Sequence, residues 1–101
     1  MELANYQNLI SKLVKERGYD KEVPAEVFLL LVEEVGELGK AIRKSSGMKV
    51  SDHSKKHQIE HELADVFWLI IDLANRFDID LAKAFAEKEK INQKRDYKID
   101  A

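Results

Sequence analysis

Apolar side chains recur every three or four residues over most of this chain, and no strand-like alternation of polar and apolar residues interrupts them. A repeat of three to four residues is typical of amphipathic helices. Four helices are therefore predicted, over about residues 3–17, 24–44, 52–77 and 81–95. The predicted fold class is all-α.

Local signals mark the ends of these helices. Gly18 follows the first helix, where a residue that readily adopts a positive φ suits a helix C-terminus. Pro24 fits the first turn of the second helix, because the N–H that proline lacks would have no helical partner there. Ser51 or Asp52 is placed to cap the third helix, and Asp80 is placed to cap the fourth.

The second predicted helix is apolar on most of its surface. Its main apolar arc consists of Val27, Leu31, Val35, Leu38 and Ile42. Leu29 and Leu30 extend this arc almost all round the first half of the helix. A helix that is apolar on most sides is usually covered on most sides. In so small a chain, this predicts a homodimer in which a second subunit covers the helix, with a dimer of dimers left open.

Composition narrows the classes of function. A length of 101 residues fits one domain, so residues 1–101 are interpreted as a single unit. Apolar residues make up 45% of the chain, too many for a disordered protein. The net charge of −2 provides no basic field to attract nucleic acid. Because there is no cysteine, disulfides, thiolate metal sites and a cysteine nucleophile are excluded.

The N-terminus and the longest apolar run bear on location. Residues 1–7 have neither the basic nor the apolar region of a signal peptide. The longest apolar run, Val27–Val32, is far shorter than the roughly 20 residues that span a bilayer. We therefore expect a cytoplasmic protein that does not enter a membrane.

Two acidic clusters lie within otherwise apolar helical sequence. The first comprises Glu33, Glu34 and Glu37, and the second comprises Glu62 and Asp65. Within each cluster, two acids stand three residues apart and so share one face of a helix. Carboxylates among apolar side chains are costly to bury unless their charge is compensated.

A hard divalent cation would compensate that charge. Two antiparallel helices can bring both acid pairs to one point, and a site made only of oxygen ligands suits Mg²⁺ or Mn²⁺ rather than zinc. The competing interpretation is that the acids form solvated faces beside Lys40, Arg43 and Lys44. The paired arrangement in two helices favours the metal site.

The same residues resemble the signature of a known family. Glu-Glu-x-x-Glu over residues 33–37, followed by Glu-x-x-Asp over residues 62–65, is similar to the motif of MazG-like nucleoside triphosphate pyrophosphohydrolases. Residues 62–80 and 87–95 resemble the same family. The resemblance covers about residues 24–95, which are taken as the core of the domain.

The resemblance implies a fold and a reaction. Helices of paired subunits would form a four-helix bundle around the acidic metal site. The enzyme would be a hydrolase of acid anhydrides that cleaves a nucleoside triphosphate between the α and β phosphates, releasing a monophosphate and pyrophosphate in clean-up of (d)NTP pools. Phosphoryl substitution chiefly needs positioning and charge neutralisation, which such a site supplies.

Carried over position by position, the resemblance assigns Mg²⁺ binding, with Mn²⁺ as a substitute, to Glu34, Glu37, Glu62 and Asp65. Glu33 would orient or deprotonate the attacking water. Glu33 could equally bind a second metal ion or pair with a lysine. Its role and the number of ions are therefore left open.

The basic end of the fourth helix has two interpretations. The resemblance places a Lys-x-Asn-x-x-Arg-like tail near the triphosphate, which matches Lys90, Asn92 and Arg95, with Lys94 as a neighbour. The alternative is that these cations only stabilise the negative end of the helix dipole.

Five further residues carry hypotheses of their own. Trp68 is expected to pack against the first helix or a partner subunit, with base stacking as the sharper alternative. Asp72 either extends the acidic site or, as we favour, is solvated or paired with a lysine. His53, His57 and His61 have a spacing that could hold a transition metal, but they fall on the face expected to be wet.

Two other functions fit parts of the pattern. Phosphoribosyl-ATP pyrophosphohydrolase shares the acid pattern in outline, although residues 62–80 resemble MazG more closely. A non-catalytic helical protein that binds metal or nucleotide and acts through partners is the alternative from another class. Base and sugar preference depends on pocket shape and a few hydrogen bonds, which the sequence does not place.

Overall fold

The computed structural model describes residues 1–47 and 59–95, and all regular structure in these ranges is helical. The helices are α1 (Leu3–Glu16), α2 (Pro24–Ser45), α3 (Ile59–Arg76) and α4 (Leu81–Lys94). The prediction of an all-α chain is confirmed. The predicted start of the third helix, at Ser51 or Asp52, lies outside the described residues. None of the described helices combines the length and apolar character that crossing a membrane requires.

α1, α2 and α3 are each followed by a residue with positive φ, which after α2 is Gly47. Gly18, with a φ of 77°, follows α1, and the N–H of Tyr19 donates back to the carbonyl of Val14 at 2.9 Å. This bond closes the last turn of α1 in the manner of a Schellman motif. Asp78, with a φ of 58°, occupies the matching position after α3. The prediction that Gly18 terminates the first helix is confirmed.

The starts of α2 and α4 follow their predicted signals. Pro24 is the first residue of α2, and Glu26 accepts a hydrogen bond from the N–H of Val23 at 3.2 Å. Asp80 precedes α4, and its Oδ1 atom accepts from the N–H of Lys83 at 3.1 Å. Such side-chain acceptors satisfy N–H groups that have no partner within the first turn.

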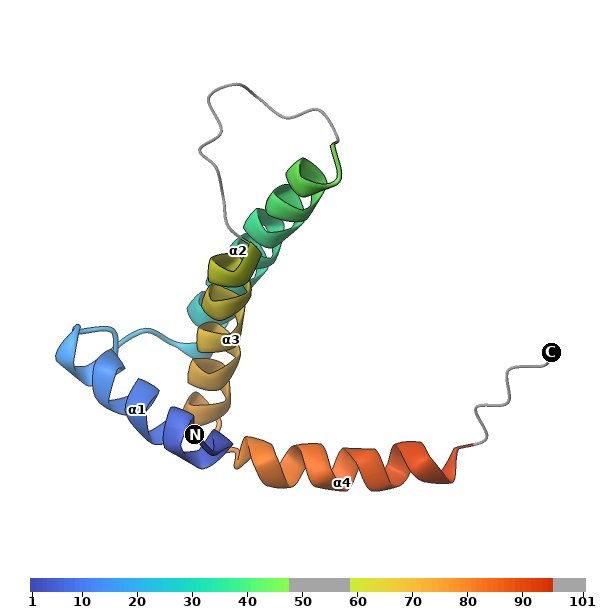
Figure 1. The fold of residues 1–101 in the computed structure, drawn as a ribbon. Coiled ribbons are helices and arrows are strands. Elements are labelled where there is room, and N and C mark those ends of the chain that lie inside the picture. The colour runs from blue at the N-terminus through green and yellow to red at the C-terminus, as the bar shows by residue number, and fades with distance from the viewer. Residues whose placement is uncertain (48–58, 96–101) are drawn as a thin grey trace.

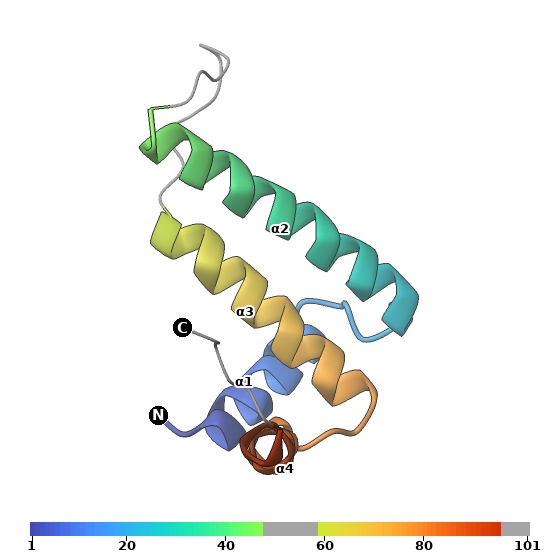
Figure 2. The same ribbon diagram turned by 90° about the vertical axis from the view of Figure 1, so that its right-hand side faces the viewer.

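The four helices form an open arrangement rather than a closed bundle. α2 and α3 lie side by side, and α1 packs across α3 (Figures 1 and 2). α4 contacts α1 and then extends away from the α2–α3 pair (Figure 1). The radius of gyration is 17.0 Å. A compact chain of this length would have a value of about 13 Å.

The buried core lies where α1 crosses α3. It consists of Ile10, Val14 and Ile71, with Leu3, Tyr6, Trp68 and Leu81 packed around them. On α2, Val27 and Ala41 are each only 1% exposed. These contacts fix the three helices that surround the acidic residues.

A polar hub joins α1 to the turn between α3 and α4. The Nε2 atom of Gln7 donates to Oδ1 of Asn75 at 2.9 Å and to the carbonyl of Ile79 at 2.8 Å. The N–H of Leu81 donates to Oε1 of Gln7 at 3.0 Å. Asn75 returns a hydrogen bond to the carbonyl of Gln7 at 2.9 Å. These bonds set the direction in which α4 leaves the core.

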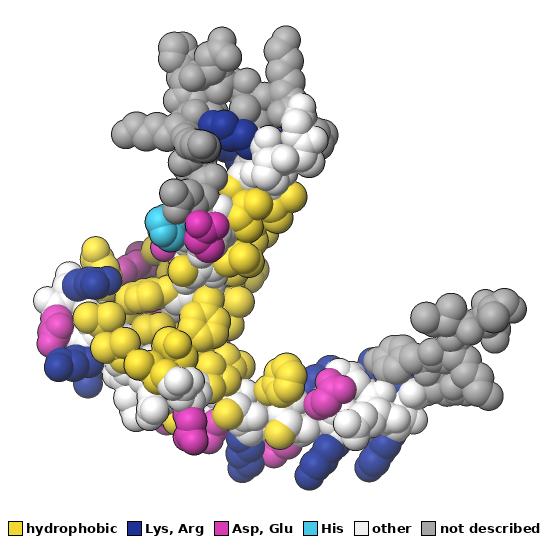
Figure 3. Space-filling model, in the orientation of Figure 1, with side chains coloured by type: hydrophobic (Ala, Val, Ile, Leu, Met, Phe, Trp, Pro, Cys, Tyr) yellow, Lys and Arg dark blue, Asp and Glu magenta, His cyan; other side chains and the backbone are white. Residues whose placement is uncertain are grey.

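The most apolar side of α3 faces outward. Hydrophobic side chains cover the inner side of the angle between the α2–α3 pair and α4 (Figure 3). We call the exposed apolar set on and directly after these helices the apolar surface; it includes Phe28, Leu29, Val32, Leu63, Phe67, Ile70, Phe77 and Phe85. Leu63 is 52% exposed and Phe77 is 59% exposed. The chain alone therefore leaves a large apolar area uncovered.

Candidate functional site

Three carboxylates meet where α2 packs against α3. Glu34 comes from α2, whereas Glu62 and Asp65 come from α3 and stand one helical turn apart. One oxygen from each lies within 4.8 Å of the others. Glu62 is buried, with 9% of its surface exposed, while Glu34 is half-buried and Asp65 is exposed. The group therefore has a buried base and an open side.

The other two predicted acids lie beside this group. Glu37 is half-buried and follows Glu34 by one turn of α2, close enough for its charge to raise the pKa of Glu34. Glu33 is exposed and is not part of the three-carboxylate group. The structure thus brings together three of the four predicted metal ligands, with the fourth within electrostatic range.

The crowding of these acids raises the pKa of Glu34 above its ordinary value of 4.5. The largest cause is burial, which disfavours the charged form. The negative charges of Asp65, Glu62 and Glu37 follow in that order, and a hydrogen bond between the side chains of Glu34 and Glu62 adds to them. A positive charge bound at this point would lower the pKa of Glu34 again.

The donor set fits a divalent cation that prefers oxygen. All three groups offer carboxylate oxygens, the ligands that suit Mg²⁺ and Mn²⁺. The Oε2 atom of Glu62 is fully buried among them. A divalent ion bound here would relieve the mutual repulsion that raises the pKa of Glu34.

A groove adjoins the carboxylates. One cavity of about 380 Å³ is lined by Arg17, Tyr19, Glu34, Asp65, Trp68 and Leu69. A second cavity of about 370 Å³ shares Tyr19, Glu34, Trp68 and Leu69 with the first. We call the two together the groove. Its walls combine two aromatic side chains with two of the clustered acids.

The structure tests the hypotheses that the sequence raised for Trp68 and Asp72. Trp68 packs against the core formed by α1 and α3, so its predicted packing against the first helix is confirmed. The same side chain also lines the groove. Asp72 is only 4% exposed, and its Oδ1 atom lies 3.0 Å from Nε of Arg76. The expectation that Asp72 is solvated or paired with a lysine is therefore wrong, because the four-residue spacing places an arginine beside it.

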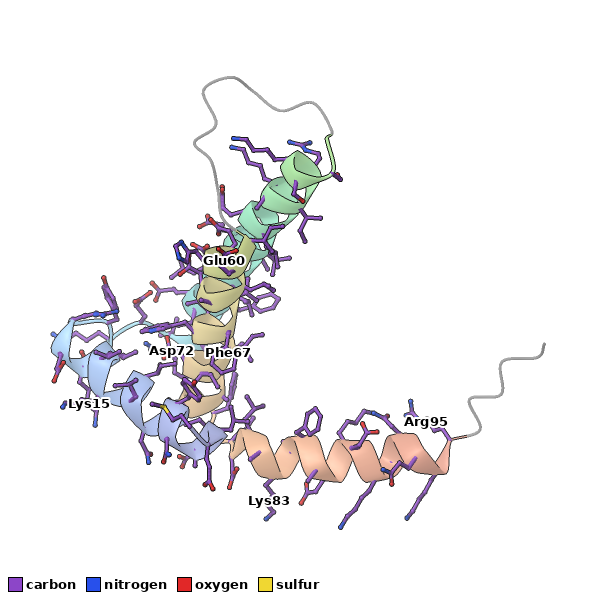
Figure 4. The ribbon with its side chains drawn as sticks, viewed as in Figure 1. Lys15, Glu60, Phe67, Asp72, Lys83 and Arg95 are labelled. Carbon is purple, nitrogen blue, oxygen red and sulfur yellow. The ribbon has the colours of Figure 1, made fainter. Side chains whose placement is uncertain are left out.

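The predicted substrate-binding tail lies far from the carboxylates of its own chain. α4 carries Lys90, Asn92 and Lys94, and Arg95 follows its last residue; the helix extends away from the α2–α3 pair (Figure 1). At 100° per residue, Lys90 and Lys94 lie on the side of Lys83, whereas Asn92 lies opposite. Arg95 and Lys83 point to opposite sides in Figure 4. The four tail residues therefore do not share one face of the helix.

The histidine series is described only in part. His61 is exposed on α3 and does not belong to the three-carboxylate group. His53 and His57 lie outside the described residues. Their hypothetical transition-metal site stays a prediction.

Three residues of the groove's surroundings were not singled out in the sequence. Arg17 and Tyr19 line the groove from the segment between α1 and α2. Arg76 donates to the backbone carbonyls of Tyr19 and Glu22. The spacing of Asp72 and Arg76 could have indicated an ion pair. No pattern in the sequence could have indicated that a short connecting segment meets α3.

Comparisons with known proteins point to one family. Residues 23–98 match the family described as the MazG nucleotide pyrophosphohydrolase domain. A search of curated protein sequences finds no match.

Three solved structures are similar to this chain over 92–95% of its length. The proposed pyrophosphatase YPJD from Bacillus subtilis is 25% identical, with a TM-score of 0.81 over 95% of this chain and 97% of that one. The MazG-like pyrophosphohydrolase of cyanophage S-2L, bound to dGDP and three catalytic Mn²⁺ ions per active site, is 28% identical, with a TM-score of 0.70 over 94% and 84%. iMazG from Vibrio DAT 722 is 30% identical, with a TM-score of 0.67 over 92% and 95%.

Proposed function

Because the chain belongs to the MazG nucleotide pyrophosphohydrolase family, which it matches over residues 23–98, we propose that it hydrolyses nucleoside triphosphates between the α and β phosphates. Family membership makes the chain a hydrolase of nucleotides. The products of the proposed reaction are a nucleoside monophosphate and pyrophosphate, and its role is clean-up of (d)NTP pools in the cytoplasm. The observation that carries this proposal is the approach of three carboxylates to within 4.8 Å in a chain of this family.

The proposed cofactor is Mg²⁺, with Mn²⁺ as a substitute. Glu34, Glu62 and Asp65 hold the ion, and Glu37 completes the acidic set. When bound, a divalent ion supplies charge neutralisation for phosphate oxygens and lowers the pKa of a bound water. Support comes from the all-oxygen donor set of this chain and from the cyanophage relative, which binds three Mn²⁺ ions per active site.

Glu33 is the proposed base. Its carboxylate accepts a proton from the attacking water as the water oxygen bonds to phosphorus and the bridging P–O bond breaks. The exposure of Glu33, one residue before Glu34, suits a group that meets water rather than one buried against the cation. A positioned base of this kind typically accelerates proton transfer by roughly 10²–10⁴-fold.

A second copy of the chain covers the apolar surface in this proposal. Helices of the two subunits form a four-helix bundle, and pairing of two dimers is compatible with it. The exposure of Leu63, Phe67 and Phe77 supports the proposal, because monomeric proteins rarely expose contiguous apolar patches of large area. The radius of gyration of 17.0 Å also supports the proposal, because a compact chain of this length would have a value of about 13 Å.

The same pairing assigns a role to the basic tail, residues 90–95. α4 carries the tail away from the carboxylates of its own chain (Figure 1), and in this proposal a second copy lies beside it. The tail is therefore proposed to contact the triphosphate bound to a partner subunit through one side of α4, with either Lys90 and Lys94 or Asn92 and Arg95. Arginine and lysine are the side chains best suited to that contact, because they form charge-assisted hydrogen bonds to phosphate oxygens.

A product assay tests the proposed function. Purified protein is incubated with dNTPs, NTPs and phosphoribosyl-ATP, with Mg²⁺ or with a chelator, and the products are identified. The expected result is monophosphate plus pyrophosphate from at least one triphosphate, lost with chelator and in Glu37→Gln or Asp65→Asn. Glu60→Gln is the matched control, because Glu60 is an exposed acid of α3 outside the carboxylate group.

Each other outcome favours a different function. Turnover of phosphoribosyl-ATP alone would assign the chain to that substrate. Release of single phosphate would contradict cleavage between the α and β phosphates. Metal binding without turnover of any substrate would favour a non-catalytic binding protein.

A further inference from the structure

The groove beside the carboxylates has one wall built on the core and one built on a connecting segment. Trp68 forms the first wall, and its contacts with the core cluster of α1 and α3 hold it in place. Tyr19 forms the second wall, from the stretch between α1 and α2, and 46% of its surface is exposed. Connecting segments are generally more mobile than the helices they join. The position of Tyr19 therefore needs a separate explanation.

Arg76 fixes that connecting segment. Its Nη2 atom donates to the backbone carbonyl of Tyr19 at 2.8 Å, and its Nη1 atom donates to the carbonyl of Glu22. Both acceptors are main-chain atoms, so these bonds hold the path of the segment whatever its side chains are. Hydrogen bonds from a charged donor are among the stronger ones in proteins.

Asp72 in turn fixes Arg76. Its Oδ1 atom accepts from Nε of Arg76 at 3.0 Å, and the exposed fractions of the two side chains are 6% and 11%. A buried ion pair with satisfied hydrogen bonds holds a defined geometry, because losing either partner leaves the other charge uncompensated. By comparison, Lys12 and Glu16 form a pair of the same spacing on the surface, with exposed fractions of 72% and 55%.

The side chains that line the groove indicate the kind of ligand it binds. Tyr19 and Trp68 present aromatic rings, and Leu69 adds an apolar side chain. Glu34 and Asp65 line the same cavity from the side of the carboxylate group. A planar heteroaromatic ring stacks well on aromatic side chains. A nucleotide in the groove would therefore place its base by the rings and its phosphates toward the carboxylates.

We propose that the Asp72–Arg76 pair is a positioning device: through the main chain of residues 19–22 it holds Tyr19 at the wall of the groove, against the base of a bound nucleotide. This inference rests on the proposed function, because it concerns the substrate of the same site. Arg76 touches no reacting atom. Its effect passes through the main chain of residues 19–22 to the wall that Tyr19 forms.

Fluorescence of the 101-residue chain tests this directly, because Trp68 is its only tryptophan. The protein is titrated in Mg²⁺ with dAMP, dGMP, dCMP and dTMP, which carry no anhydride to hydrolyse, and with ribose 5-phosphate as a probe without a base. At least one deoxynucleotide should change the Trp68 emission in a saturable way, whereas ribose 5-phosphate should not.

Variants separate positioning from general stability. Arg76→Met should weaken nucleotide binding by roughly tenfold, the low end expected for a lost stacking contact. Lys12→Met, which breaks the surface pair of equal spacing, should leave binding unchanged. Arg76→Lys should recover part of the loss, since it keeps the charge beside Asp72 but has no fork to reach two carbonyls. Tyr19→Ala should weaken binding as Arg76→Met does without disturbing the buried pair, and Tyr19→Phe should not.

Kinetics supply the second readout. Arg76→Met and Tyr19→Ala should raise KM for triphosphate by the same factor as Kd, with kcat within about twofold of the parent, because only a contact to the base is lost. A variant that merely unfolds would instead lose its turnover together with its helical circular dichroism. If Arg76→Met does not fold, Arg76→Lys tests the positioning role, and nucleotide binding by a folded Arg76 variant equal to that of the wild type would overturn it.

Distinct results overturn the two proposals. No response of Trp68 to any nucleotide, or equal binding by wild type and Tyr19→Ala, would overturn the base-binding groove. If triphosphates are hydrolysed normally in that case, the proposed function stands. If nucleotides bind in the groove and no triphosphate is hydrolysed, the proposed function fails and the groove stands.

Discussion

A carboxylate oxygen of Glu34 lies within 4.8 Å of one from Glu62 across the contact between α2 and α3. Two negative charges this close repel each other, so the charge of Glu62 helps to raise the pKa of Glu34. The raised pKa of Glu34 follows from this contact together with burial, its largest cause. The metal-free site is therefore electrostatically strained at neutral pH.

The first prediction concerns pH and metal. Because the pKa of Glu34 is raised above 4.5 in the folded state, its contribution to stability is fully present below pH 4.5 and is lost as pH rises through the raised pKa. Metal-free protein should therefore lose part of its free energy of unfolding across that window, and Mg²⁺ should restore it at pH 7. Thermal unfolding in chelator and in Mg²⁺, at a series of pH values, measures both effects.

Glu34→Gln is the control for that experiment. Subtracting its pH profile from that of the parent isolates Glu34 from the other carboxylates. A parent and a variant with identical profiles in chelator would contradict the assignment of the raised pKa to Glu34.

The second prediction separates the ligands from the base. Asp65→Asn should weaken Mn²⁺ binding by at least the roughly tenfold that follows loss of an outer-shell partner in other metal sites. Glu33→Gln should leave Mn²⁺ affinity unchanged and lower kcat by roughly 10²-fold or more, as expected for loss of a general base. Titration followed by electron paramagnetic resonance of free Mn²⁺ measures the affinities. Equal loss of affinity in both variants would make Glu33 a ligand instead.

The third prediction concerns the hub at Gln7. Gln7→Ala removes the acceptor of the Leu81 N–H and the donor to Asn75 and Ile79. It should lower the free energy of unfolding by about 1–3 kcal/mol, since polar groups that are partly buried lose their partners. Urea denaturation at one fixed protein concentration measures this. Asn8→Ala, at the neighbouring exposed position, should change it by less than about 0.5 kcal/mol, and equal effects of the two would argue against the hub.

The fourth prediction concerns assembly. The wild type should sediment as a dimer or a dimer of dimers at micromolar concentration. Leu63→Lys should shift it toward monomer, because a charge would be buried in the apolar contact. His61→Lys, exposed on the opposite side of α3, should leave the assembly intact. A wild type that sediments as a monomer would contradict the proposed pairing.

The helix boundaries were predictable because their signals are local. Gly18 and Asp80 act on the backbone within one turn, and Pro24 begins α2 as expected. The side of α3 that is buried was not predictable. An apolar arc that includes Leu63 and Phe67 has the same pattern whether its own chain or a second copy covers it.

The candidate site was likewise predictable only in part. Three-residue spacing within α3 predicted that Glu62 and Asp65 share a face, and Glu34 does meet them across the helix contact. The wall formed by Tyr19 depends on a connecting segment that meets α3 more than fifty residues further along the chain. No periodicity encodes such a contact.

Product analysis by ³¹P nuclear magnetic resonance tests the central claim most directly. A deoxynucleoside triphosphate that the protein turns over in Mg²⁺ should give pyrophosphate and monophosphate in equal amounts, with neither product formed by Asp65→Asn. Appearance of orthophosphate with a nucleoside diphosphate, or unchanged turnover in Asp65→Asn, would contradict α–β cleavage at the carboxylate group of α2 and α3.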